Sequence, residues 1–245
     1  MTRMTLAVLV RVLAATVCAG PAWADDAVRL TPSRVLVPGF ESLPRVVDGV
    51  PAPARARING ALAAADKRGM AARTDCLAQQ DPAEPSIMEW TRAVTVTQAG
   101  PRWLAVLVSD EMFCGGAHPD ADVFPLVFDV RTGRPPDWTR LLPRSLAGEA
   151  VLSTAGDGTR IGLVRSAALL RRAVAQAPAD CKAILDRDAG QFAVWPGDGR
   201  LNAVVFGLPH VAAACADAVG LTPAELRGLG ASDLAVTIAP GRKSP

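Results

Sequence analysis

The run of residues 103–133 constrains the fold of this chain more than any other stretch. Apolar and β-branched residues 103–108 lead toward the glycine pair Gly115 and Gly116, and an alternating segment at residues 123–130 leads away from it. Glycine permits positive φ, and Pro119 fixes φ on leaving the turn. The run therefore predicts two antiparallel strands joined at a rigid corner that other backbone can approach closely.

Further strands and turns extend this hairpin into a sheet. Residues 89–97 alternate between apolar residues and threonine, which is typical of a strand with one buried face. With strands at 103–110 and 122–130 they predict an antiparallel meander. A second hairpin is predicted at residues 191–206, around Pro-Gly-Asp-Gly. The expected fold class is α+β, an antiparallel meander sheet with helices packed on it.

The remaining elements are predicted from periodicity and caps. Residues 35–37 suggest an edge strand or extended arm, and a helix follows Pro53 with an apolar stripe that Gly69 is expected to end. We expect Thr159 to cap a helix through residue 174. The spacing of Thr222 and Glu225 predicts a capping box, and residues 232–238 are expected to form a last strand.

The first 24 residues have the pattern of a secretory signal peptide. A basic start and a short apolar stretch precede the Ala-Trp-Ala site at residues 22–24. We expect cleavage after Ala24, one domain at residues 25–238, a disordered tail at 239–245 and a periplasmic or secreted product. Removing Arg3 and Arg11 leaves 24 Lys and Arg against 24 Asp and Glu. The balance predicts no nucleic-acid partner. No second apolar stretch is long enough to span a bilayer, so we expect no stable membrane insertion after cleavage.

The mature chain keeps four cysteines, and an even number in an exported protein indicates disulfides. We favour Cys76 with Cys114 and Cys181 with Cys215, because each pair joins neighbours along the chain. Closing either loop would stabilise the fold by about 4 kcal/mol in the chain-entropy model. Free thiols and a metal site are the alternatives, although no Cys-x-x-Cys spacing supports zinc.

Side chains that could bind a metal or transfer a proton are concentrated in the sequence near the glycine corner. His118 lies in the sequence with carboxylates that could hold a divalent cation, and we name His118, Asp120 and Asp122 as candidate metal ligands beside Asp110 and Glu111. The competing interpretation makes His118 a structural turn residue and the carboxylates solvated hairpin ends. We expect no cofactor and assign no catalytic residue, because the sequence contains no nucleophile motif, no zinc-protease motif and no phosphate-binding glycine loop.

Other candidates have structural alternatives as well. His210, the second histidine, is expected to pack near a strand end. Four tryptophans could stack on the sugar rings of a glycan, but tryptophan at strand positions more often fills the core. These are Trp90, Trp103, Trp138 and Trp195.

The motif Cys114, Gly115, Gly116, Ala117, His118, Pro119 resembles a known family. With the strand after it and the later Trp138, it is similar to the exported domains of unknown function typified by the ectodomain of the anti-sigma factor RsiV. A comparable domain occurs in the peptidoglycan deacetylase PdaC. The resemblance implies an α+β domain of the cell envelope with a binding role, lysozyme being the ligand of the anti-sigma relative.

We therefore expect an exported, non-catalytic domain that binds a protein or envelope component, with lysozyme as one candidate partner. The alternative is an envelope hydrolase, or a metal-binding protein, that uses His118 and nearby carboxylates.

Overall fold

The computed structural model describes residues 28–79, 88–115, 118–187 and 190–238. The predicted leader at 1–24 and tail at 239–245 lie outside the described residues, as do Gly116 and Ala117. Helices and antiparallel-rich sheets make the chain an α+β protein, as the sequence predicts. No helix within the described ranges is long and apolar enough to span a membrane.

The predicted meander forms the first sheet, with the strand order β2-β3-β5-β6-β7. Its long strands are β5 (Glu89–Ala99), β6 (Trp103–Phe113) and β7 (Asp120–Asp129), all antiparallel. At the edge lie β2 (Val35–Val37) and β3 (Phe40–Glu41), and β3 joins β5 in parallel. The edge strand predicted at residues 35–37 is therefore present.

The second sheet has the strand order β12-β11-β10-β9-β8. Its members are β8 (Glu149–Thr154), β9 (Arg160–Arg165), β10 (Gln191–Gly197), β11 (Arg200–Val205) and β12 (Val219–Leu221). The β10–β11 hairpin is the predicted one, and its turn residues Asp198 and Gly199 both have positive φ, at 54° and 68°. Such a pair matches the twist of the flanking strands.

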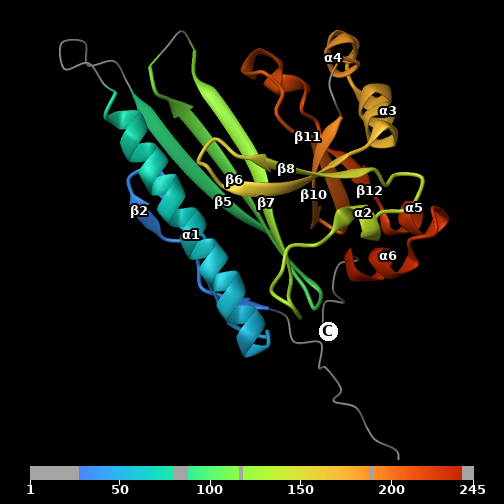
Figure 1. Cartoon of the computed structure of the whole chain (residues 1–245), viewed down its shortest axis with the longest axis horizontal. Coiled ribbons are helices and arrows are strands. Elements are labelled where there is room, and N and C mark those ends of the chain that lie inside the picture. Colours follow the sequence, from blue (N-terminus) through green and yellow to red (C-terminus); the bar gives the residue numbers. More distant parts are fainter. Residues whose placement is uncertain (1–27, 80–87, 116–117, 188–189, 239–245) are drawn as a thin grey trace, which may run out of the picture.

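One hydrophobic core joins the two sheets, because β10 packs across β5, β6 and β7. Helix α1 (Ala52–Leu77) lies beside the β8–β9 hairpin over the first sheet, as Figure 1 shows. The remaining elements are α2 (Trp138–Leu141), α3 (Ala167–Gln176), α4 (Ala179–Leu185), the 3₁₀ segment η1 (His210–Cys215), α5 (Pro223–Gly228), α6 (Ser232–Ile238) and the pair β1 (Arg29–Leu30) with β4 (Val46–Asp48).

Helix α1 continues past Gly69 to Leu77, so the predicted end of the helix is wrong. The glycine serves close packing instead. A Cβ at Gly69 would lie 2.3 Å from Nη1 of Arg92, a side chain that reaches across from β5. The helix tolerates the lower helix propensity of glycine because this position must leave room for a guanidinium.

Two other predictions of local structure are wrong. Thr159 does not cap a helix, because residues 160–165 form β9, and α3 begins only after Ser166, whose side chain caps it. Residues 232–238 form α6 rather than a strand, since Leu234, Ala235 and Ile238 are the buried positions and follow helical spacing. Tertiary burial overrides a weak local pattern in both cases.

Both predicted disulfides are present. Cys76 at the end of α1 is bonded to Cys114 after β6, with Cα atoms 4.8 Å apart. Cys181 of α4 is bonded to Cys215 at the end of η1, with Cα atoms 5.3 Å apart. The first bond fixes the far end of the long helix to the first sheet, and the second joins two peripheral helical segments. The capping box of Thr222 and Glu225 is present too.

The packing at Gly69 predicts opposite effects for two glycines of α1. Gly69→Ala should destabilise the fold by roughly 1–3 kcal/mol, because the added methyl overlaps the completely buried Arg92 side chain. Gly60→Ala, where a Cβ would meet nothing within 4 Å, should stabilise it by roughly 0.5–1 kcal/mol. Chemical denaturation measures both, and equal stabilities would contradict the contact.

Candidate functional site

The carboxylates of the glycine corner point to different partners rather than to a common ion. Asp110 is completely buried and Asp122 half-buried, whereas Glu111, His118 and Asp120 are exposed. Asp122 Oδ2 accepts a hydrogen bond from the N–H of Gly156, 2.5 Å away, and Asp120 bonds the N–H of Ala121. The described residues contain no group of three or more metal-ligating side chains.

Asp110 belongs to a buried ion cluster with Arg92 and Asp157, here called the Arg92 cluster. Arg92 donates from Nε and Nη2 to the two carboxylate oxygens of Asp110, at 2.6 and 2.5 Å. Nη2 also donates to Asp157 Oδ2 at 2.7 Å, and Asp157 Oδ1 accepts from the N–H of Thr159. All three ionic side chains are completely buried. The cluster attaches the β8–β9 turn to the centre of the first sheet.

The rest of the guanidinium is enclosed by packing. Its Cζ lies 4.6 Å from the centre of the Phe40 ring, and Gly69 of α1 lies against Nη1. Nη1 has no hydrogen-bond partner among the described residues. A buried guanidinium with two carboxylates is net negative, so its stability depends on complete pairing. The complete burial and mutual pairing of its three side chains make the cluster a structural element.

Burial raises the pKa of Asp110, although the bonds from Arg92 act in the opposite direction. Burial also raises the pKa of Asp122 above its ordinary value of 3.8, against the hydrogen bond from Gly156, and the nearby charges of Asp110 and Asp157 add to the effect. Loss of hydration disfavours the ionised form of each carboxyl. These two groups are therefore the pH-sensitive part of the corner.

The four candidate tryptophans lie in the core. The exposed fractions of Trp90, Trp103, Trp138 and Trp195 are all 7% or less. Trp103 and Trp138 contact each other with ring centres 5.7 Å apart, and Trp103 Nε1 donates to Thr237. This burial does not fit sugar stacking, which needs an exposed ring face, although Trp138 also lines a cavity described below. The side chain of His210 lies outside the described part of the chain.

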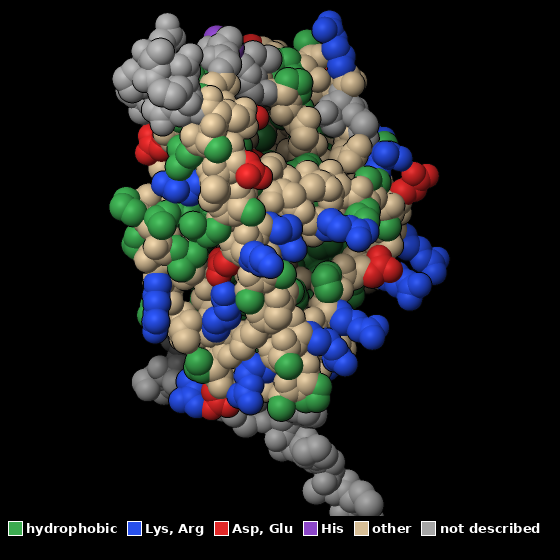
Figure 2. Space-filling view, turned by 60° about the vertical axis from the view of Figure 1, so that its left-hand side comes forward, with side chains coloured by type: hydrophobic (Ala, Val, Ile, Leu, Met, Phe, Trp, Pro, Cys, Tyr) green, Lys and Arg blue, Asp and Glu red, His purple; other side chains and the backbone are tan. Residues whose placement is uncertain are grey.

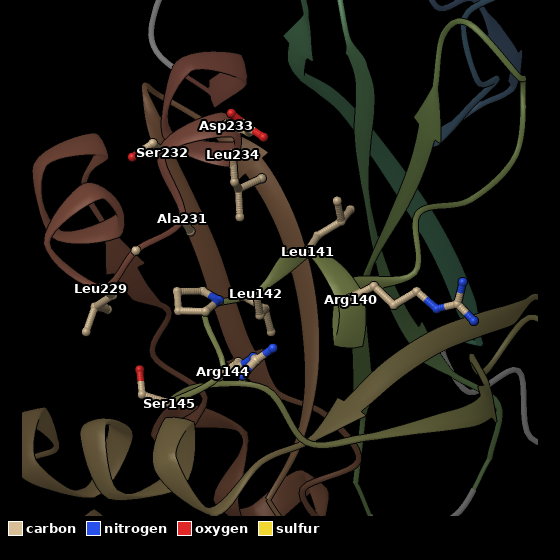
Figure 3. Close-up of a pocket in the computed structure, with 12 residues that line it drawn as sticks. Arg140, Leu141, Leu142, Arg144, Ser145, Leu229, Ala231, Ser232, Asp233 and Leu234 are labelled. Atoms are coloured by element: carbon tan, nitrogen blue, oxygen red, sulfur yellow. The ribbon is translucent and has the colours of Figure 1, made fainter.

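A large open hollow of about 720 Å³ lies between the α2–β8 connection and the α5–α6 connection. Figure 3 shows Leu141, Leu142 and Leu234 turned toward it, with Ser232 and Asp233 at its upper rim and Arg140 extending away. Arg140 is paired with Asp137. The hollow contains no convergent set of polar groups, which a specific small-molecule site requires.

A smaller cavity of about 280 Å³, here called the α1–β9 groove, has two defined walls and an apolar floor. Ala61, Ala64 and Arg68 of α1 form one wall, and residues 159–162 form the other. The apolar floor is formed by residues 125–128 of β7, Trp138 and Val194, with Pro135 and Pro136 at one side. Arg68 Nε donates to Thr159 Oγ1, 3.3 Å away, where the two walls meet.

The groove opens where two neighbouring strands of the second sheet separate. β9 and β10 pair only at Arg165 with Gln191 and at Val164 with Phe192. Continuing that register would pair Gly162 with Val194, yet no such pair forms, and both residues line the groove. The sheet is thus split at this point, and backbone that would join two strands faces a cavity instead.

Arg68 and Arg160 line this groove, and further arginines lie on the segments next to it. Arg57, Arg68, Arg131, Arg134 and Arg160 lie on α1, on the turn before Pro135 and at the start of β9, and none of them forms an ion pair within the described residues. No Asp or Glu lines the groove. Figure 2 shows Lys and Arg side chains spread over the face that α1 presents, with few acidic ones.

Sequence reasoning directed attention to the corner and missed the groove. Its residues are ordinary alanines, prolines and a strand glycine from four separate segments, and no local motif joins them. The two-residue spacing of Ile161 and Leu163 is the one local signal of β9, and the helical pattern predicted after Thr159 conceals it. A corrected strand assignment would still not reveal that β9 leaves β10.

Comparison with known proteins adds no assignment, since no protein-family model matches the chain and no curated protein is similar to it. The resemblance to the RsiV-like domains accordingly stays a prediction from the glycine corner.

The Arg92 cluster should be indispensable for folding. Arg92→Ala would leave two buried carboxylates without a cation and should cost about 3–5 kcal/mol of unfolding free energy. The matched control is Arg165→Ala, which removes an exposed pair with Glu149 and should cost less than about 1 kcal/mol. Denaturant titration compares them, and a loss below 1 kcal/mol in Arg92→Ala would refute the assignment.

The raised pKa of Asp122 predicts a pH effect of definite sign. Between the ordinary value of 3.8 and the raised value, the folded state binds a proton that the unfolded state has lost, so stability falls as pH rises. Asp122→Asn keeps an acceptor for Gly156 but cannot ionise, and should weaken this fall in Tm. Asp120→Asn on the exposed neighbour is the control. Identical Tm–pH slopes in wild type and Asp122→Asn would exclude the effect.

Proposed function

We propose that the protein is an exported binding domain of the cell envelope and that its ligand is a protein held in the α1–β9 groove. One observation carries this proposal: the second sheet opens at Gly162 and Val194 into an apolar cavity rimmed by arginines. Protein cores are normally closed at such points, because backbone polar groups need partners and apolar surface favours burial. An open split therefore indicates a surface that another chain completes.

Export is supported by the chemistry of the cysteines. Two disulfides join the four cysteines of the mature chain, and such bonds persist in oxidising compartments. The predicted leader at residues 1–24 agrees with that compartment. A periplasmic or secreted location is thus part of the proposal.

The hydrolase and metal-binding alternatives have less support from the geometry of the corner. Asp110 is held by Arg92, and Asp122 is held by the backbone of the β8–β9 turn. Neither is directed at a cavity together with the exposed His118. We therefore interpret the glycine corner as the scaffold that fixes the hairpin beside the groove.

Site-directed photo-crosslinking in the cells that export the protein tests the groove. Ala64→p-benzoylphenylalanine places the reactive group on the exposed groove wall of α1. We expect a discrete higher-mass adduct that is lost when Gly162→Pro is added. The control is Ala224→p-benzoylphenylalanine, at an exposed position of α5 on another part of the molecule, which should give no such adduct.

Absence of any Ala64 adduct, or the same adduct from Ala224, would overturn the proposal. Lysozyme, the partner that the resemblance suggests, is tested separately by passing it over the immobilised mature protein. No retention would remove lysozyme from the candidates while leaving the crosslinking result to decide about the groove.

A further inference from the structure

We infer that the α1–β9 groove accepts an extended, acidic peptide segment of its partner, which adds as a strand along the open edge of β9. This inference rests on the proposed function and specifies the chemistry of the ligand. Three properties of the groove support it: the direction of the free backbone groups, the space beside them, and the charge around them.

The hairpin turn fixes the direction of the backbone groups of β9. The N–H of Ala155 bonds the carbonyl of Thr159, so the hydrogen-bonded pairs with β8 continue at Ile161 and Leu163. In an antiparallel ladder the intervening residues point their N–H and C=O groups outward. Arg160 and Gly162 are such residues, and Val164 uses its outward groups to pair with Phe192.

The backbone groups of β10 alternate in the matching way, so that every second residue points its N–H and C=O toward β9. The backbone groups of Phe192 face β9, and those of Pro196 have the same direction, because its carbonyl accepts a hydrogen bond from Thr97 Oγ1. Val194 has the same orientation between them. The outward groups of Gly162 therefore have no ladder partner in the described residues, and they lie in the wall of a cavity. Unpaired strand edges of this kind are the sites where peptides add by main-chain hydrogen bonds.

The space beside the open edge of β9 is wide enough for the backbone of an added strand. A Cβ at Gly162 would meet nothing within 4 Å, so nothing crowds the strand there. The facing wall consists of Ala61 and Ala64, whose methyl groups leave the groove open. The cavity of about 280 Å³ has room for a few residues only. Leu126 of its floor and Ile161 of its wall offer apolar contact for alternate side chains.

The charge around the groove selects the sign of the ligand. Arg68 and Arg160 line it, and Arg57 lies one helical turn from Ala61 on the same face of α1. These cations have no acidic partner among the described residues, and the nearest buried acid, Asp157, is already bonded to Arg92. Acidic side chains of an incoming segment would complete the pairing, chiefly as steering and specificity.

The backbone edge distinguishes a peptide from other polyanions. A nucleic acid or an anionic polysaccharide would use the arginines but has no alternating N–H and C=O groups with which to continue the ladder. The inference therefore predicts dependence on both charge and main-chain hydrogen bonding.

Fluorescence anisotropy with synthetic peptides tests both properties on the full mature protein. The probe is a labelled octapeptide of alternating Glu and Val, and its charge control alternates Lys and Val. Two backbone controls carry N-methyl groups on all Glu or on all Val residues, because only every second N–H of a strand faces one edge. We expect saturable binding of the Glu–Val peptide, at least tenfold weaker binding of the Lys–Val peptide, and at least tenfold loss with one of the methylated peptides.

Two protein variants locate the binding. The double change Arg68→Ala with Arg160→Ala should weaken binding of the Glu–Val probe at least tenfold, whereas Arg171→Ala with Arg227→Ala removes the same charge from exposed positions on α3 and α5 and should leave it unchanged. Gly162→Pro removes one outward N–H without touching a bond to β8, and should also abolish binding. Thermal melts confirm that each variant is folded.

The inference is overturned if the Glu–Val probe does not bind, if neither methylated peptide is impaired, or if an oligothymidylate competes as well as the unmethylated peptide. Failure of the peptide experiment together with a groove-specific Ala64 adduct would remove the acidic-strand ligand and keep the binding function. Loss of the adduct would remove both.

Discussion

The buried pairing of Arg92 with Asp110 and Asp157 is the interaction on which the rest of the architecture depends. It brings together β5, β6, the β8–β9 turn and the Gly69 face of α1 at a completely buried point. Removing Arg92 would leave two uncompensated carboxylates in the interior, which is far more costly than losing an exposed pair. The hairpin is consequently fixed at its tip to a sheet of which it is not a member.

That attachment explains why the α1–β9 groove exists. The base of β9 is held by its pairing with β10 at Val164 and Arg165, whereas the tip is held over the first sheet by Asp157 and by the bond from Gly156 to Asp122. A strand fixed at two places on different sheets cannot follow β10 along its whole length. The space between them becomes a cavity with one wall of backbone. The Cys76–Cys114 bond holds α1 and the first sheet together beside it.

The net charge of the chain does not reveal the positive charge at the α1–β9 groove. Residues 25–245 have equal numbers of basic and acidic side chains, and this balance predicts no basic surface. Folding places several of the acids in internal pairs, as with Asp110, Asp157 and Asp66, while Arg68 of α1 and Arg160 of β9 line one groove that no acid lines. Net charge therefore describes solubility better than it describes the field at a particular site.

Local chemistry was enough to predict the meander, the Asp198–Gly199 turn, the capping box and both disulfides, because strand alternation, turn glycines and neighbouring cysteines act over short sequence distances. The same reasoning failed at Gly69 and residues 160–165, where a contact from a distant element outweighs propensity. Whether β9 stays with β10 or leaves it, and how Arg68 of α1 and Arg160 of β9 come to line one groove, depends on long-range packing. Only the tertiary structure decided these features, since the free energies that determine them arise between residues far apart in the chain.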